Sequence, residues 1–436
     1  MPTRYVTART AQLYAAPAGG AHTMVLIFGD EVDVTGPADG ARTPVTYRGR
    51  AGFVRSQHIG DRPPLELYFI DVGQGDATFI VTPGRKTILI DGGLNRRALG
   101  FLAWKYRLDE PGPPIDLDLL VLSHADCDHL DGLAPIVGHP RIRVRQVIHS
   151  GIAVFAAGAY ATPLGDLDRS GGCLITRHSS LAELDGLRLS ARFAAWRDAL
   201  AAEGCGYRAV DSTSGTLDIG DPAVKIEVLG PRLDQPGARP ALRWFESSAR
   251  TINGHSVVLR LTYGGVSVLL PGDLNRDGAE HLLADPALAA RVDAHVLKAP
   301  HHGSHEFFPP LLEAICPQIS VISSGDDVDH GHPRAVFVGA VGHYSRSAEP
   351  LVFSTEIAAN FVEAGETPEP EPPAAERGGF GTPAANARAR ILFKRRLHGM
   401  INVRSDGRRL YAARRVMASY KWEAYGPLAP AARPNR

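Results

Sequence analysis

The spacing of hydrophobic and polar residues changes near residue 65. Before it, segments such as "MVLIFGDEVDVTG" and "TPVTYRGRAGFV" alternate apolar and polar residues between Gly and Pro turns. This close spacing predicts a small all-β barrel over residues 1–62. After it come the apolar runs "LELYFIDVG", "TILIDGG" and "LDLLVLSHAD". The first two end in Asp and Gly, and the third ends in His and Asp. Unbroken apolar runs of this length are typical of strands buried on both faces in an α/β fold.

Helix and turn signals divide the rest of the α/β region. "HLDGLAPIVGH" predicts a helix directly after the run that ends in "SHAD", so the His and Asp residues between them lie on a strand-to-helix loop. Residues 151–250 form a less regular insert, where a helical pattern opens at Ser179 or Ser180 and closes at Gly204. Apolar strands then return as a hairpin that turns at Gly264–Gly265.

The end of the chain differs in composition. Residues 366–385 are rich in Pro, Glu, Ala and Gly, which predicts a linker. Residues 386–425 predict a short β-rich C-terminal module with a turn at Asp406–Gly407. Within it, residues 386–415 carry ten basic residues and one acidic residue. A basic strand pair can follow a phosphate backbone, although a solvated face without a partner explains the same pattern.

The bulk composition excludes several classes of protein. The 436 residues are 44% hydrophobic and 22% charged, which is ordinary for globular domains. Lys plus Arg and Asp plus Glu number 47 each, so net charge makes no case for nucleic acid or a membrane. No apolar run approaches the roughly 18 residues of a membrane span, and the N-terminus lacks a signal-peptide pattern. Four cysteines that form no CxxC pair favour a reduced, cytoplasmic protein without a membrane partner.

The loop "SHADCDHLDG" concentrates side chains that bind metals. His124 and Asp126 are one residue apart, Asp128 follows at the same spacing, and His129 comes next. On a loop that leaves a strand, alternate side chains project the same way, so one pair can reach one ion while the other pair reaches a second. Two ions about 3.5–4 Å apart that share a carboxylate and a water form a hydrolytic centre. A solvated acidic loop is the alternative for this stretch alone.

Further candidate ligands lie where other apolar strands open into loops. His255 stands in "NGHSVVLRL", and Asp273 stands in "LLPGDL" at the end of the next strand. His301 and His302 stand in "LKAPHHGS". Each stretch is unremarkable alone, but their occurrence in order after buried strands predicts one shared metal site.

Taken together, "TILIDGG", "SHADCDHLDGL", a His before a hairpin, "GD" at the hairpin's end and "HHGS" resemble the motifs of the metallo-β-lactamase superfamily. The resemblance implies an αββα sandwich for residues 65–361, of the α/β class. "DVGQGDA", an Asp in place of the motif's second His, and "DHGHPR" are similar to the hydrolase domain of bacterial DNA-uptake channel proteins and to phosphorylcholine esterases. Residues 1–62 resemble a bacterial Src homology 3-like domain, which implies a peptide or protein partner; a packing module without a ligand is the alternative.

The resemblance also implies a role for each matching residue. The ligand set comprises His124, Asp126 and His255 for one ion, Asp128, His129 and either His301 or His302 for the other, and Asp273 as the bridge. The residues expected to support these ligands or face the substrate are Asp91, Asp76, Asn253, Ser304 and His332. The residues expected to act directly in catalysis are Asp128, Asp273 and His302. Cys127 projects to the alternate side of its loop and is not expected to be a ligand.

The implied function is metal-dependent hydrolysis in a dinuclear site, through a hydroxide that bridges the two ions. Zn²⁺ is the expected ion, and the extra carboxylate of Asp126 makes Mn²⁺ the alternative. A phosphodiester of nucleic acid or a nucleotide is the expected substrate. One alternative is hydrolysis of a lactone, thioester or phosphorylcholine ester in the same site, and another is a non-enzymatic binding module on the same fold.

Overall fold

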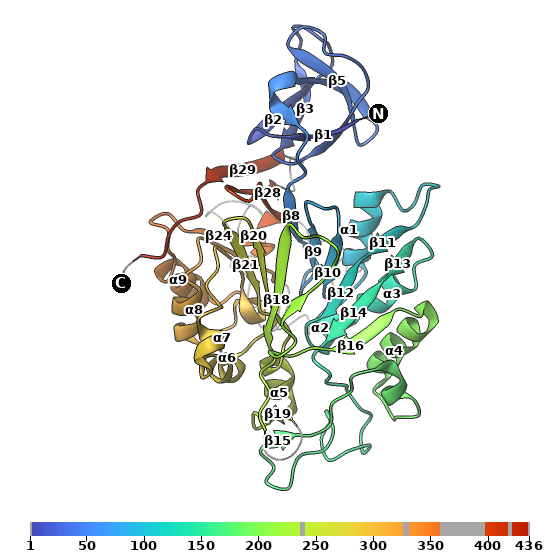
Figure 1. Ribbon diagram of the computed structural model, residues 1–436, viewed down its shortest axis with the longest axis vertical. Helices are drawn as coiled ribbons and strands as arrows, with labels where there is room; N and C mark the ends of the chain where they lie inside the picture. Colours follow the sequence, from blue (N-terminus) through green and yellow to red (C-terminus); the bar gives the residue numbers. More distant parts are fainter. Residues whose placement is uncertain (1, 236–239, 326–330, 358–396, 417–420, 435–436) are drawn as a thin grey trace, which may run out of the picture.

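The computed structural model describes residues 2–235, 240–325, 331–357, 397–416 and 421–434. The N-terminal part is an antiparallel seven-stranded sheet that curls around its own small core (Figure 1). In β2 (Thr10–Tyr14) buried and half-buried residues alternate, because only one face of the strand meets that core. The other strands are β1 (Thr3–Val6), β3 (His22–Ile27), β4 (Glu31–Val34), β5 (Arg42–Tyr47), β6 (Arg50–Arg55) and β7 (Ile59–Gly60).

Two large sheets form the centre of the rest of the molecule. The first has nine strands, in the order β16 (Gly206–Ala209), β14 (Gln146–His149), β12 (Leu119–Leu122), β10 (Thr87–Ile90), β9 (Thr78–Val81), β8 (Leu65–Phe69), β27 (Ile401–Ser405), β28 (Leu410–Val416) and β29 (Lys421–Leu428). The second has seven strands, in the order β17 (Thr216–Leu217), β18 (Val224–Gly230), β20 (Val258–Tyr263), β21 (Val266–Leu270), β22 (Val296–Lys298), β23 (Ile319–Ile322) and β24 (Leu351–Ser354). The hairpin of β20 and β21 turns at Gly264–Gly265, as the sequence predicts.

Helices cover the outer faces of both sheets, so the layers run helix, sheet, sheet, helix (Figure 1). In β12, Leu119 and Val121 face the core between the sheets, while Leu120 and Leu122 face the helices. A strand buried on both faces must be apolar throughout, which explains the unbroken apolar runs. The first sheet is covered by α1 (Arg97–Tyr106), α3 (Leu133–Val137) and α4 (Ala191–Glu203), and the second by α6 (Arg276–Leu283), α7 (Pro286–Ala289), α8 (Pro309–Ile315) and α9 (Ala335–His343).

The insert carries a shorter helix than its pattern predicts. Leu181–Leu184 form a single 3₁₀ turn, and the chain leaves helical geometry at Asp185, whose backbone is extended, and at Gly186, whose φ is +73°. Helix α4 begins only after Ser190, whose hydroxyl accepts a hydrogen bond from the N–H of Phe193. It ends at Gly204 in the left-handed conformation, where the sequence places its end.

Short elements complete the described chain. They are α2 (Cys127–Leu130), α5 (Ser248–Gly254), two further 3₁₀ turns (Ser56–His58 and Pro300–Gly303), and the strands β11 (Ile115–Leu117), β13 (Ile142–Val144), β15 (Cys173–Leu174), β19 (Leu242–Arg243), β25 (Glu356–Ile357) and β26 (Leu397–His398). The helix predicted after "SHAD" is present as α2 and α3. In the part of the chain that the structure describes, no helix has both the length and the apolar character needed to cross a membrane.

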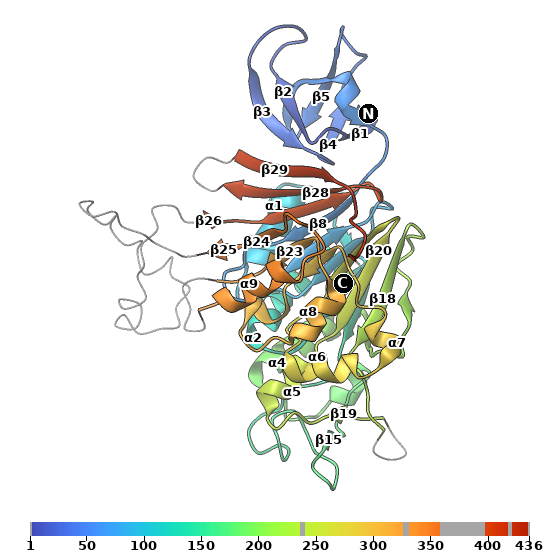
Figure 2. The same cartoon turned by 90° about the vertical axis from the view of Figure 1, so that its left-hand side faces the viewer.

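The C-terminal strands continue the first sheet. Strand β27 pairs antiparallel with β8, and β28 and β29 follow it, so the hairpin that turns at Asp406–Gly407 lies between the sandwich and the N-terminal sheet (Figure 2). The sequence pattern predicts that residues 386–425 form a module of their own, whereas these strand pairs join the described part of that segment to the nine-stranded sheet. The predicted linker, 366–385, and residues 386–396 lie outside the described residues.

Several basic side chains of this hairpin are already paired. Arg404 is buried, donates to Asp30 at 2.9 Å and to the hydroxyl of Tyr68 at 3.2 Å, and so ties β27 to the N-terminal sheet. Arg414 lies 2.6 Å from Glu423 and Arg409 lies 3.2 Å from Asp406. These three guanidinium groups are engaged within the protein, so contact of this hairpin with a phosphate backbone stays a prediction.

Candidate metal centre

Loops at the carboxyl ends of strands from both sheets meet at one end of the sandwich. In the first sheet, Asp91 follows β10 and His124 follows β12 at a distance of two residues. In the second, Asp273 follows β21 and His302 follows β22. Strands β10 and β12 run parallel, as do β21 and β22, so their carboxyl ends lie at one edge of each sheet. This edge is where the sequence places the metal site.

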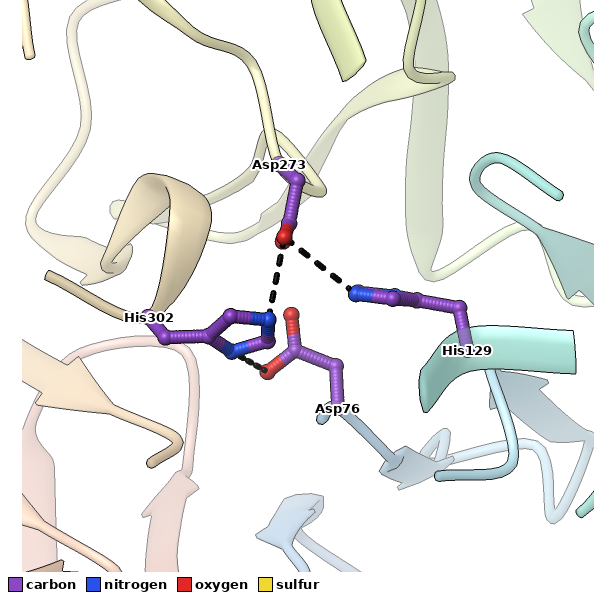
Figure 3. Close-up of side chains that lie close together, drawn as sticks. All are labelled: Asp76, His129, Asp273 and His302. Carbon is purple, nitrogen blue, oxygen red and sulfur yellow. Dashed lines mark ion pairs between the residues drawn. The ribbon is translucent and has the colours of Figure 1, made fainter. Parts of the chain in front are cut away.

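Four buried side chains converge there (Figure 3). The ligand atoms of Asp76, His129, Asp273 and His302 all lie within 4.8 Å of one another. Oδ2 of Asp273 is 3.3 Å from Nε2 of His129 and 3.0 Å from Nε2 of His302. Both Nε2 atoms are buried and make no hydrogen bond. Imidazole nitrogens and carboxylate oxygens that converge on one point are the donor set of Zn²⁺ and similar ions, so these residues fit a divalent metal.

Asp128 adds a further candidate ligand beside this cluster and distinguishes His302 from its neighbour His301. Its Oδ2 lies 3.3 Å from Nε2 of His302 and accepts a hydrogen bond from Gln74 at 3.2 Å. Nδ1 of His302 lies 3.0 Å from the carbonyl oxygen of Ser323. This oxygen can accept a hydrogen bond from Nδ1–H, which leaves Nε2 facing the carboxylates. His302 is therefore the ring that reaches Asp128 and Asp273.

Asp76 enters the cluster from the loop between β8 and β9. Gly75 in this loop has a φ of +106°, and a Cβ atom there would lie 2.0 Å from the carbonyl oxygen of Asp128. Only glycine fits such a close approach of two backbones. The N–H of Asp76 donates to the same carbonyl oxygen at 3.3 Å. The sequence predicts a supporting role for Asp76, and the structure places its carboxylate among the candidate ligand atoms.

Asp91 supports the site from behind His129. Its fully buried carboxylate accepts hydrogen bonds from the N–H of Ser123 at 2.7 Å and from its hydroxyl at 2.6 Å. Nδ1 of His129 lies 2.8 Å from the same carboxylate. A proton held on Nδ1 leaves Nε2 unprotonated and free to bind a metal. This geometry matches the supporting role that the resemblance implies for Asp91.

The predicted first ion position is only partly assembled. Nε2 of His124 is buried without a hydrogen bond and lies 3.6 Å from Oδ2 of Asp126, and the His124 ring lies 4.1 Å from that of His129. In contrast, Nε2 of His255 lies 2.7 Å from the carbonyl oxygen of Arg243, and its ring stacks on Phe245. Nδ1 of His255 is buried without a hydrogen bond, so this nitrogen is open to an ion while Nε2 stays on the carbonyl, and the role of His255 stays a prediction.

Three further candidates are His332, Ser304 and Asn253. The ring of His332 lies 5.8 Å from that of His301 and 6.1 Å from that of His302. Ser304 is buried, and its hydroxyl accepts a hydrogen bond from the N–H of Glu306. Asn253, on α5, is buried with a side-chain oxygen that makes no hydrogen bond. The substrate-facing roles predicted for these residues are not decided by these contacts.

Lys298 is a feature of the site that sequence reasoning missed. Its side chain is 3% exposed, and its Nζ contacts the carboxylate of Asp76 and lies 3.5 Å from Oδ1 of Asp273. The only signal in the sequence is a Lys that ends the apolar run "AHVLK", just before "APHHGS". A Lys at a strand end is ordinarily exposed, so this position becomes informative only once the two sheets are assembled.

The charges of the cluster shift one another's pKa values. Burial opposes protonation of His302, but Asp273 and Asp76 outweigh it and raise the pKa of His302 to about 10. The pKa of His129 is likewise raised by Asp273 and Asp91 against the effect of burial. Burial would raise the pKa of Asp273, yet the two histidines and Lys298 hold it well below its usual value. The carboxylates thus favour positive charge here, and a metal must displace protons to bind.

Comparison with known families agrees with this fold and site. Residues 70–308 match the model of the metallo-beta-lactamase superfamily. The match covers more than half of the chain and includes the candidate residues from Asp76 to His302. The chain belongs to the metallo-beta-lactamase superfamily, and it carries that superfamily's hydrolase fold with a buried Asp and His cluster suited to a divalent metal.

The relatives include proteins of bacterial competence. The chain is 25% identical over 288 residues to ComE operon protein 3 of Bacillus subtilis (strain 168), an alignment of 62% of this chain and 29% of that protein. It is 37% identical over 82 residues to competence protein ComA of Neisseria gonorrhoeae, which covers 19% of this chain and 12% of ComA. The chain thus spans less than a third of either relative.

Solved structures of similar chains are metallo-beta-lactamases. One, from Cronobacter sakazakii with a mutated HARLDQ motif, is 16% identical, with a TM-score of 0.26 over 53% of this chain and 75% of that one. Another, SMB-1 bound to 2-mercaptoethanesulfonate, is 12% identical, with a TM-score of 0.26 over 54% of this chain and 79% of that one.

Proposed function

We propose that this protein is a metal-dependent phosphodiesterase that acts on nucleic acid or a nucleotide. The observation that carries the proposal is the convergence of His129, Asp273 and His302 at the strand ends, with ring nitrogens and carboxylate oxygens aimed at one point. When bound, divalent ions supply positive charge and lower the pKa of water from 15.7 to about 7. The positive charge of two ions stabilises the reaction of an anionic diester more than that of a neutral lactam.

A different set of residues would bind each of the two ions. His124 and Asp126 would hold one ion, and His129 and His302, with Asp128, would hold the other. Asp273 lies against both of the latter rings and is the candidate to serve both ions. We propose Zn²⁺ as the native ion and Mn²⁺ as the alternative.

Surrounding groups keep these donors in the metal-binding state. The carboxylate of Asp91 and the carbonyl oxygen of Ser323 each accept a hydrogen bond from Nδ1–H of a ligand histidine, which leaves both Nε2 atoms facing the cluster. Gln74 donates to Asp128 and limits rotation of that carboxylate. His301 lies beside the cluster, and burial lowers its pKa. The ring is therefore neutral at pH 7. We propose that His301 forms a hydrogen bond with the substrate and does not act as the proton donor.

The name of one relative, competence protein ComA, supports a nucleic-acid substrate, because competence concerns the uptake of DNA. The basic C-terminal strands and the N-terminal sheet are further candidates for contact with nucleic acid and with a peptide, respectively. These contacts extend the proposal and do not carry it.

A panel of substrates tests the proposal directly. The purified protein, loaded with Zn²⁺ and then with Mn²⁺, should cleave bis(p-nitrophenyl) phosphate and a DNA or RNA oligonucleotide, with little cleavage of a β-lactam. Asp273→Asn should abolish this activity, while Asp221→Asn, a buried aspartate outside the cluster, should keep it. Faster cleavage of a lactone, thioester or phosphorylcholine ester, lost in Asp273→Asn, would instead identify another class of hydrolase. Metal binding without any cleavage would favour a binding module.

A further inference from the structure

Lys298 brings an ammonium group into the middle of the candidate ligands. It is the last residue of β22, and its side chain is nearly inaccessible to solvent. Besides its contacts with two carboxylates, Nζ donates a hydrogen bond to the carbonyl oxygen of Gly272 at 3.1 Å. Gly272 directly precedes Asp273, so Lys298 holds both the backbone and the side chain of this turn.

The contact makes the two carboxylate oxygens of Asp273 different. Oδ1 faces Nζ of Lys298 at 3.5 Å, whereas Oδ2 faces Nε2 of His129 and Nε2 of His302. The N–H of Asp273 also donates to the hydroxyl of Ser256, which fixes the start of the side chain. A carboxylate held on one side by a cation presents only its other oxygen to the ligand cluster.

Asp76 accounts for the charge of Lys298 but not for its position. An isolated ammonium buried this deeply would be costly, and the carboxylate of Asp76 in contact with it offsets that cost. Asp76 also lies 3.7 Å from Nδ1 of His302, so the ion pair lies against the ligand histidine. Charge balance alone would be satisfied by two neutral side chains, whereas the contact with Asp273 requires a donor.

We propose that Lys298 is a positioning residue that turns Asp273 so that Oδ2 alone faces the metal ions. This inference rests on the proposed metal-dependent function and adds a residue to it. Loss of Lys298 would free the Asp273 carboxylate to rotate and to bind through both oxygens. The expected cost resembles that of removing other groups that orient ligands, which is about 10–100-fold in metal affinity or activity.

The test removes the cation without leaving an unpaired buried charge. In the double variant Asp76→Asn/Lys298→Met both partners become neutral, so the net charge of the site does not change. The matched control is Lys86→Met/Asp118→Asn, which removes an ion pair of 3.0 Å outside the cluster. Each protein is loaded with Co²⁺, whose visible absorption spectrum depends on ligand number and geometry, and kcat is measured on bis(p-nitrophenyl) phosphate.

Because Asp76 is itself a candidate ligand, Asp76→Asn alone is the reference for the loss of that carboxylate. We expect the double variant to bind Co²⁺ with a visible spectrum that differs from that of Asp76→Asn and to lose about tenfold or more in kcat relative to it, while the control keeps the parental spectrum and kcat. A double variant that matches Asp76→Asn in spectrum and kcat would overturn the proposal, because Lys298 would then only neutralise Asp76. Should the double variant fail to fold, Lys298→Arg gives the same test. Its charge is kept but its planar head cannot occupy the place of Nζ, so an unchanged spectrum and kcat would overturn the proposal.

The same measurements separate this inference from the proposed function. If the parental protein binds Co²⁺ but cleaves no diester, the proposed function fails, and the spectra alone still decide the role of Lys298. If the parental protein cleaves the diester and the double variant matches Asp76→Asn in both readouts, only the role of Lys298 fails.

Discussion

The hydrogen bond between Asp91 and His129 should set the metal affinity of the site. Asp91→Asn is the sharpest perturbation of it, because the change keeps the size of the side chain. The φ of Asp91 is +61°, in the left-handed region, where Asn is one of the few residues tolerated without strain. The variant should therefore fold, and its effect should come from hydrogen bonding.

The expected magnitude follows from the groups around the carboxylate. It now accepts from the N–H of Ser123, from the hydroxyl of Ser123 and from Nδ1 of His129. The oxygen of an Asn can keep the first of these bonds, but its NH₂ group then faces Nδ1. His129 must move its proton to Nε2, the atom aimed at the cluster. Loss of such a supporting acceptor weakens metal binding by about 10–100-fold, which corresponds to about 1.4–2.7 kcal/mol.

Competition with a coloured chelator at pH 7.5 measures this affinity for Zn²⁺. The control is Asp221→Asn, since that carboxylate also accepts backbone hydrogen bonds, from Gly84 at 2.6 Å and Ala223 at 2.9 Å, but lies outside the cluster. It should lower stability without changing the affinity for metal. Parental affinity in Asp91→Asn, with parental metal content, would show that Asp91 does not set the protonation of His129.

Four further outcomes are expected. His124→Ala should lower bound metal from about two ions per chain towards one, as elemental analysis would show; the same analysis of His255→Ala decides whether the unpaired Nδ1 of that ring binds an ion. Asp273→Ala should lower turnover at least about a hundredfold together with metal content, since charge stabilisation and ligand are lost together; near-parental turnover would exclude a bridging role. Burial lowers the pKa of His149 to about 3, so the unfolded chain protonates this ring at a higher pH than the folded chain does. The free energy of unfolding therefore falls as the pH drops from about 6.5 towards 3, and melting curves of His149→Asn should show a smaller loss of stability between pH 7 and pH 4. Arg404→Met leaves Asp30 without its buried partner and should lower the free energy of unfolding by about 3–5 kcal/mol in chemical denaturation; a change below about 1 kcal/mol would mean that the pair contributes little.

Local patterns in the sequence determined the elements and the type of site. The unbroken apolar run "LDLLVL" requires cover on both faces, which is the state of β12 between the helices and the second sheet. "SHADCDH" indicates metal chemistry because few other roles need two imidazoles and two carboxylates so close together on a strand-to-helix loop. Gly204 and Gly264–Gly265 mark a helix end and a hairpin turn, since both need backbone conformations that glycine adopts freely.

Tertiary structure alone decided which side chains meet and which way they point. Burial patterns report that a strand is covered but not by what, so nothing local predicts that β27 pairs with β8 far away in the chain. His301 and His302 are neighbours with equal chemistry, and only the position of Ser323 and Asp128 selects His302. Lys298 joins the cluster because two sheets bring their strand ends together and the buried ammonium finds a carboxylate there. Such choices depend on contacts between residues distant in sequence, whose energies no local pattern encodes.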